Sequence, residues 1–187
     1  MIPSDHFVRF YNEVFKFLDE RDGLQDYYEE VSHEQARASA KLFWEKGMKG
    51  IKEHFDRIYR EENCTNENWT TDTCRYSAMT KCPSLSKATN NDGGLCEKYC
   101  LHCPGWELPL LTRCGIYCVY DLIGLHKPDC REFKSETREE AEAFLRKILA
   151  EGADPEMIRT NLDQADLVES YRQRRLRGEP MPKELFE

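Results

Sequence analysis

The sequence lacks any long apolar run. No stretch approaches the roughly 20 consecutive apolar residues that a membrane-spanning helix needs, and 33% of all residues are charged. A helical membrane protein is therefore excluded. Residues 1–20 also lack the basic start and unbroken apolar core of a signal peptide, because acidic and basic residues interrupt the phenylalanines there. We expect a cytoplasmic protein with no membrane partner.

A region of net positive charge is also missing. The formal net charge is -8, and acidic residues outnumber basic residues in each of the ranges 1–63, 64–130 and 131–187. A protein that binds nucleic acid needs a basic surface against the phosphate backbone. The sequence therefore predicts a small-molecule substrate rather than a nucleic acid as the partner, and it leaves self-association into a homo-oligomer open.

Cysteine is absent from residues 1–63 and 131–187, and all nine cysteines fall between Cys64 and Cys130. In a cytoplasmic protein such thiols stay reduced, so they are expected to be core residues, metal ligands or catalytic groups. With 40% hydrophobic residues, the chain can build a core without disulfides. Any chemistry is therefore expected in this cysteine-rich block.

The length of 187 residues fits a single domain, residues 1–187. Hydrophobic periodicity divides it into a helical part, a cysteine-rich α+β part, C-terminal helices and an extended tail. These parts cover residues 1–63, 64–134, 135–177 and 178–187. Helices on both sides of a central block of strands favour an α+β fold, in which a small antiparallel sheet packs with a cysteine-bearing helix.

Apolar residues at spacings of three and four predict the helices, and β-branched and aromatic alternation predicts the strands. One helix is expected before Gly23, and the next has a single unbroken apolar face as far as Ile58. This second helix is expected to begin at Ser32, and a third runs from Leu95 to Pro104–Gly105. In the C-terminal part, one helix begins at Ser135 or Thr137 and another at Asp154, and a last helix covers residues 163–177. The strands are expected over residues 68–76, 115–123 and 130–134, the last two as a hairpin.

Cys96, Cys100 and Cys103 are spaced as i, i+4 and i+7, so they would share one face of a helix. One interpretation is a buried stripe, because free cysteine is among the most buried residue types. A second is a zinc site or an iron–sulfur cluster, for which Cys82 would be a further ligand. A third is that these thiols line a catalytic pocket.

Cys82 and Cys130 stand at expected element ends, where a thiol can be exposed and activated as a nucleophile. Three residues could carry protons beside them. His102 lies among the helix thiols and His126 lies in a turn, while Asp121 interrupts an apolar strand and would need a partner or a raised pKa.

The helix with the three cysteines is predicted to pack across the strand Gly115–Ile123. The two-residue period of a strand would point Ile116, Cys118 and Tyr120 to the same side. Small cysteine side chains leave more room than leucine would, so a pocket is expected between helix and strand, with the thiols of the element ends at its rim.

Three short motifs resemble the L-2-amino-thiazoline-4-carboxylic acid hydrolase family over about residues 30–134. They are Lys81-Cys82-Pro83 after a strand, Tyr99-Cys100 in a helix, and a terminal strand that bears Cys130 before Phe133. The resemblance implies an α+β fold and hydrolytic opening of a cyclic carbon–nitrogen or carbon–sulfur bond. It also implies functional roles for Cys82, Cys100 and Cys130.

The preferred hypothesis is a small hydrolase-like enzyme that acts on a small polar metabolite containing sulfur or nitrogen. The alternatives are a metal- or iron–sulfur-binding protein and a non-catalytic interaction module whose thiols are core residues. The expected catalytic residues are Cys82, Cys100, Cys130, His102 and Asp121, and the expected metal ligands are Cys96, Cys100, Cys103 and Cys82.

Overall fold

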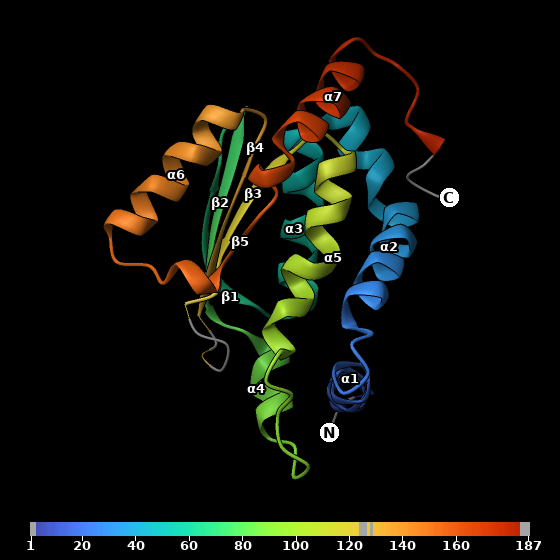
Figure 1. The fold of residues 1–187 in the computed structure, drawn as a ribbon, viewed down its shortest axis with the longest axis vertical. Coiled ribbons are helices and arrows are strands. Elements are labelled where there is room, and N and C mark those ends of the chain that lie inside the picture. The colour runs from blue at the N-terminus through green and yellow to red at the C-terminus, as the bar shows by residue number, and fades with distance from the viewer. Residues whose placement is uncertain (1–2, 124–126, 128, 184–187) are drawn as a thin grey trace.

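The computed structural model describes residues 3–123, 127 and 129–183. Within them, five strands form one antiparallel sheet in the order β1-β2-β4-β3-β5 (Figure 1). The strands are β1 (Thr65–Thr70), β2 (Cys74–Lys81), β3 (Tyr117–Asp121), β4 (Cys130–Ser135) and β5 (Ile158–Thr160).

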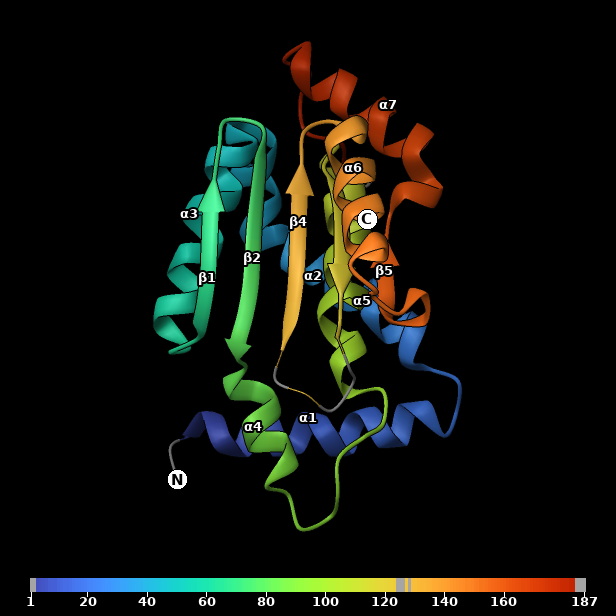
Figure 2. The same ribbon diagram turned by 90° about the vertical axis from the view of Figure 1, so that its left-hand side faces the viewer.

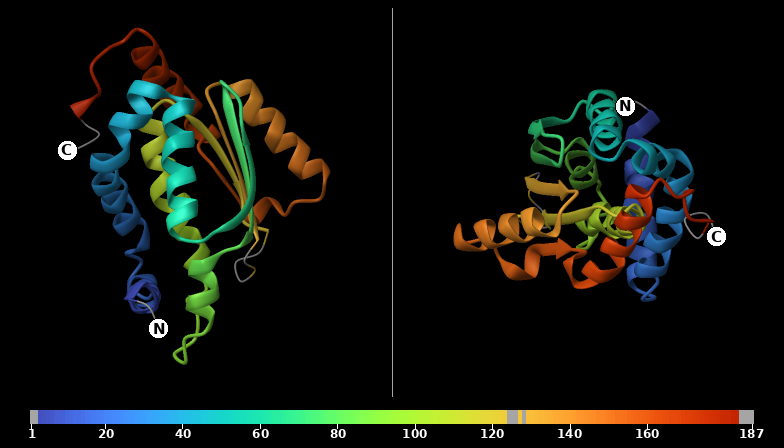
Figure 3. Two further views of the ribbon diagram at one scale, coloured as in Figure 1. Left: turned by 180° about the vertical axis from the view of Figure 1, so that it is seen from behind. Right: turned by 90° about the horizontal axis from the view of Figure 1, so that it is seen from above.

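Helices cover both faces of this sheet (Figure 3). Helices α2, α3 and α5 lie on one face and α6 on the other, while α1 and α4 lie side by side beyond the end at which β2 finishes (Figure 2). The α+β class predicted from the sequence is therefore confirmed. The α-helices are α1 (Pro3–Asp19), α2 (Leu24–Lys46), α3 (Met48–Glu61), α4 (Pro83–Thr89), α5 (His102–Arg113), α6 (Arg138–Ala150) and α7 (Ala165–Leu176), and the 3-10 turns are η1 (Tyr99–Leu101), η2 (Pro155–Met157) and η3 (Leu162–Gln164). None of the helices in the described part of the chain has the length and apolarity to cross a membrane.

Strand β3 separates two apolar clusters by the alternation of its side chains. Ile116, Cys118 and Tyr120 pack into the cluster formed with α2, α3 and α5. Tyr117 and Val119 pack into the second cluster, beneath α6. The predicted facing of this strand is confirmed, because successive side chains point to opposite sides of a sheet.

The prediction of one helix that begins at Ser32 and runs unbroken to Ile58 is wrong in two respects. The helical segment begins at Leu24, and Gly47 divides it into α2 and α3. Gly47 has φ +53°, a conformation that glycine adopts without a steric penalty. The chain reverses there, so the apolar stripes of both helices still reach the same core.

The strand predicted over residues 68–76 is a hairpin. Strands β1 and β2 pair with Trp69 opposite Tyr76, whose rings stack at 5.7 Å. Thr71 forms the turn, because its Oγ1 accepts hydrogen bonds from the backbone N–H of Thr73 and of Cys74 at 3.2 and 3.0 Å. This local side-chain bonding favours a turn over a continuous strand.

The prediction of a helix that runs from Leu95 and ends at Pro104–Gly105 is also wrong. The chain before η1 is irregular, and α5 begins at His102, so Pro104 stands in its first turn. Proline is tolerated there because the first N–H groups of a helix have no partner within the helix.

The C-terminal part follows the prediction at α6 and departs from it afterwards. Thr137 caps α6 by accepting a hydrogen bond from the N–H of Glu140 at 3.4 Å. Asp154 caps only the 3-10 turn η2, and the chain then enters β5, which pairs with β3. The hydrogen bonds available at the open edge of β3 outweigh the helix-starting signal of Asp154-Pro155.

Candidate functional site

A cavity of about 300 Å³ opens at the end of the sheet where β2 passes into α4 and β4 begins. Figure 2 shows this end of the sheet beside α4. Helices α3 and α5 supply further walls. We call it the thiol cavity, and its lining includes Phe55, Tyr59, Cys64, Ser77, Met79, Cys82, His102, Cys103, Trp106, Glu107, Tyr120, Cys130 and Glu132.

Cys82 is held at the junction of β2 and α4. Its Sγ accepts a hydrogen bond from the N–H of Leu85 at 3.4 Å, as the cap of α4. Pro83 follows at the first helical position, which its fixed φ suits. Burial raises the pKa of the Cys82 thiol, although the N–H groups of Leu85 and Ser84 act in the opposite direction. Cys82 is therefore a protonated thiol at neutral pH.

His102 and Cys103 form a hydrogen-bonded pair on the cavity wall. The Nδ1 of His102 lies 2.6 Å from the backbone oxygen of Tyr99, and its Nε2 lies 3.3 Å from the Sγ of Cys103. Because a carbonyl oxygen only accepts hydrogen bonds, Nδ1 carries the proton and Nε2 is left to accept the thiol proton of Cys103. Burial lowers the pKa of His102, which keeps the imidazole neutral and able to act as a base.

The rings around His102 fix its orientation. Phe15 of α1 stacks on the imidazole with 5.6 Å between ring centroids, and Tyr99 meets it edge-on at 5.0 Å. The hydroxyl of Tyr99 in turn lies 2.6 Å from Ser84 Oγ in α4. The base is thus positioned by packing from two other helices.

A buried charge cluster forms the floor of the cavity. The ammonium group of Lys134, which is fully buried, lies 3.2 Å from a carboxylate oxygen of Glu107 and 2.5 Å from one of Glu132. Tyr120 donates a hydrogen bond to Glu107 at 2.5 Å, and Tyr59 donates one to Glu132 at 2.9 Å. Two carboxylates therefore share one cation.

The two carboxylates differ in their proton affinity. Burial raises the pKa of Glu107 to about 7, and the negative charge of Glu132 adds to this effect while Lys134 opposes it. Burial acts to raise the pKa of Glu132 as well, but the charge and hydrogen bond of Lys134 outweigh it and lower that pKa. Near neutral pH, Glu107 is therefore the carboxyl group that can give or take a proton.

Four thiols influence each other in and around the cavity. Burial raises the pKa of Cys100 to about 12, with a contribution from Cys82. Burial likewise raises the pKa values of Cys103 and Cys130, and the other thiols of this group contribute to both. All four are neutral thiols at physiological pH, so any nucleophile among them needs a neighbouring base. All nine cysteines, which lie within the described residues, are free thiols.

The predicted meeting of helix thiols with Cys82 and Cys130 is confirmed for Cys103, which lines the same cavity as both. Cys100, in η1, lies next to this group. The predicted common helical face is wrong, because α5 begins only at His102. Cys96 lies outside the lining of the cavity, in an apolar cluster with Phe15 and Leu24 against which Cys82 and Cys100 pack, and its N–H donates a hydrogen bond to Asn12 Oδ1 at 2.8 Å.

Asp121 has the partner that its position required, but it is not among the residues that line the thiol cavity. Its carboxylate accepts hydrogen bonds from the Nε of Arg131 at 2.8 Å and from the N–H of Ile123 at 3.1 Å. Arg131 also pairs with Glu151 at the end of α6. Asp121 alternates with Tyr120 along β3, so it faces the α6 side. His126 lies outside the described residues.

The charge cluster was not predicted from the sequence. Glu132 and Lys134 alternate along β4 with Arg131 and Phe133, which reads as a solvent-exposed face rather than a buried one. One signal was available at Glu107, a single acidic residue within the apolar stretch of α5. A lone charge among apolar residues in a helix indicates a buried polar contact.

The predicted metal site has no geometric support. Among the residues that the structure describes, no group of three or more histidine, cysteine, aspartate or glutamate side chains is placed to hold a metal ion. Cys82 packs against the apolar cluster that contains Cys96, but Cys96 is not among the residues that line the thiol cavity with Cys82 and Cys103. Zinc or iron–sulfur binding remains a prediction from cysteine spacing.

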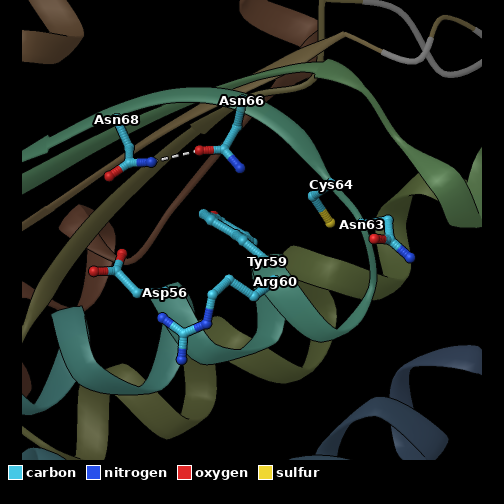
Figure 4. A pocket seen from close by; sticks show the side chains of 7 residues that line it. All are labelled: Asp56, Tyr59, Arg60, Asn63, Cys64, Asn66 and Asn68. Carbon is cyan, nitrogen blue, oxygen red and sulfur yellow. Dashed lines mark hydrogen bonds between the residues drawn. The ribbon is translucent and has the colours of Figure 1, made fainter.

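A second hollow, the asparagine groove, adjoins the thiol cavity. It has a volume of about 790 Å³ and runs between α3 and β1 (Figure 4). Tyr59 and Cys64 line both the groove and the cavity. The lining of the groove is Asp56, Tyr59, Arg60, Asn63, Cys64, Asn66 and Asn68.

Comparison of the chain with protein-family models, with curated proteins and with solved structures yields no match.

Proposed function

We propose that the chain is a hydrolase that uses a cysteine nucleophile on a small polar substrate with an electrophilic carbon bonded to nitrogen or sulfur. The observation that carries the proposal is the hydrogen bond between Cys103 and His102 on the wall of the thiol cavity. The resemblance to the thiazoline-carboxylate hydrolase family supports the same reaction class.

Cys103 is a better candidate nucleophile than Cys82. Its thiol donates to His102, a neutral imidazole fixed in the required tautomer. The thiol of Cys82 instead accepts a hydrogen bond from a backbone N–H, with no base bonded to it among the described residues. A nucleophile within hydrogen-bond reach of an oriented base is the arrangement that activates a thiol.

The proposed reaction has two stages. Cys103 Sγ adds to the electrophilic carbon while its proton passes to His102 Nε2. The carbon–nitrogen or carbon–sulfur bond then breaks, and the leaving atom takes that proton. Water next attacks the carbon of the covalent intermediate, its proton returns through His102, and the carbon–sulfur bond to Cys103 breaks to restore the thiol.

Glu107 supplies a second proton carrier. It stands four residues after Cys103 on α5, which places both side chains on one face of the helix. With its pKa near 7, it can protonate the heteroatom of the reacting carbon as negative charge develops there. The volume of about 300 Å³ limits the reacting end of the substrate to a small molecule.

The test is a hydrolysis screen of cyclic amidines, thiazolines and lactams, followed by NMR. We expect Cys103→Ala to abolish turnover, and His102→Gln to slow it about 100-fold or more, as loss of a general base does. Cys74→Ser is the matched control, because Cys74 is buried on β2 and its thiol contacts Thr71 outside the cavity. Full turnover by Cys103→Ala would refute the assignment of the nucleophile.

A further inference from the structure

The asparagine groove and the thiol cavity adjoin each other. Tyr59 and Cys64 form their shared wall, and each is partly exposed. Burial, with contributions from Cys82 and Glu62, raises the pKa of Cys64 to about 11, and the contribution of Cys82 indicates that the two thiols lie close together. A molecule that lies along the groove is therefore next to the thiol cavity where Tyr59 and Cys64 line both hollows.

Arg60 is the basic residue among those that line the groove. Within the described part of the chain, the guanidinium group of Arg60 forms no hydrogen bond or ion pair, and its side chain lies along the groove in Figure 4. The carboxylate of Asp56 already forms two ion pairs, one with Lys52 and one with the buried Arg75, whose Nη2 lies 2.8 Å away. Arg60 therefore remains available to a ligand.

Amide groups of Asn66 and Asn68 lie across the groove from this cation (Figure 4). Asn68 Nδ2 donates to Asn66 Oδ1 at 2.5 Å, which fixes the orientation of both side chains. No acceptor for the Nδ2 of Asn66 lies among the residues that the structure describes, so its hydrogens can donate to a ligand. Asn63, at the end of α3, has its side chain on the same groove. A guanidinium group fits the planar, two-oxygen shape of a carboxylate, and the asparagines on the other side of the groove offer further N–H donors to the same ligand.

We propose that the asparagine groove binds a carboxylate on an extended substrate whose reactive end enters the thiol cavity. The role of the reactive end rests on the proposed function, whereas the carboxylate subsite rests on Arg60 and the asparagine amides. The substrate class is therefore a molecule longer than the thiol cavity, with an electrophilic carbon at one end and a carboxylate at the other.

Alkylation of Cys64 tests the subsite without a known substrate. Iodoacetate and iodoacetamide react by the same displacement of iodide by a thiolate, and they differ only in the carboxylate. The ratio of their rates at Cys64, measured by peptide mass spectrometry, cancels the thiolate fraction. We expect this ratio to be several-fold higher in the folded protein than in the same chain unfolded in urea.

Arg60→Gln should return the ratio to that of the unfolded chain. Arg57→Gln is the matched control, because Arg57 is an exposed residue of the same helix that does not line the groove, and it should leave the ratio unchanged. Salt should also abolish the preference in the unmodified protein, since it screens exposed charges. An equal ratio in the unmodified protein and Arg60→Gln, or a ratio insensitive to salt, would overturn the subsite. Loss of turnover in the hydrolysis screen would leave this result untouched.

Discussion

The ammonium group of Lys134 lies 3.2 Å from the Glu107 carboxylate in the interior of the protein, and Glu132 competes for the same cation. Burying two carboxylates with one lysine leaves one negative charge in excess. The structure accommodates that excess by raising the pKa of Glu107 to about 7, with burial as the main cause. The cluster is thus stable in its protonated form and strained when both carboxylates are charged.

The first prediction concerns pH and the free energy of unfolding. The folded pKa of Glu107 is raised above its unfolded value of 4.5, so the folded state holds a proton that the unfolded state releases between these values. Stability from this group therefore falls as pH rises from 4.5 to about 7. Glu107→Gln should remove that fall, and urea denaturation of both proteins at several pH values measures the difference. If the free energies of unfolding of both proteins changed equally with pH, that result would contradict the raised pKa of Glu107.

The second prediction concerns Lys134 itself. Lys134→Met should lower the free energy of unfolding at neutral pH by about 3–5 kcal/mol, since it leaves buried carboxylates without a counterion. The loss should shrink in acid, where the carboxylates are protonated. Lys41→Met is the control, because Lys41 is 74% exposed and lies 3.8 Å from Glu45, and it should cost less than about 1 kcal/mol.

The third prediction concerns the end of α5. Gly115 has φ +68°, and the N–H groups of Gly115 and Ile116 bond back to Thr112 and Leu111 to close the helix. A Cβ there would lie 2.3 Å from the backbone nitrogen of Arg172 in α7. Gly115→Ala should therefore cost about 3 kcal/mol or more, from backbone strain and the displaced helix.

Gly152→Ala isolates the strain component. Gly152 has φ +91°, and an added Cβ would meet nothing within 4 Å. Its cost should be about 1–2 kcal/mol, as expected for a left-handed residue alone. Equal losses of unfolding free energy in Gly115→Ala and Gly152→Ala would show that α7 moves away from the added Cβ without an energetic cost.

The fourth prediction distinguishes a hydrolase from a metal-binding protein. Because the described residues contain no cluster arranged for a metal ion, dialysis against a chelator should leave the melting temperature and turnover unchanged. Protein purified without air should contain well under one equivalent of zinc or iron. About one equivalent, lost together with thermal stability, would favour metal or iron–sulfur binding instead.

Local patterns were sufficient to predict α6 and β3. The cap at Thr137 and the alternation across β3 involve neighbouring residues in the sequence, so they are visible without the fold. The reversal at Gly47 and the strand β5 were missed because both depend on distant partners. A three-residue strand such as β5 has little periodicity of its own and exists because β3 offers it an edge.

The same distinction between local and distant contacts decides which parts of the candidate site could be predicted. The gathering of Cys82, Cys103 and Cys130 was predicted from their places at element ends and on a cysteine-bearing segment. The buried cluster of Glu107 and Lys134 was not, because a charged residue in a sequence normally indicates the surface. The pairing of β4 with both β2 and β3 places Lys134 in the interior, where it meets Glu107 of α5.

That pairing also governs the order in which the chain can fold. Cys74 of β2 lies opposite Ser135 of β4. During synthesis, the two strands can therefore pair only after the ribosome has added the residues of α4, α5 and β3, which lie between them in the sequence. Contacts between residues far apart in sequence slow folding, because the intervening loop must close before they form. Cys82 and Cys130 stand at the two ends of this loop, and Cys103 lies within it. Before the loop closes, these thiols are exposed to oxidants, so recovery of native protein should depend on a reducing medium.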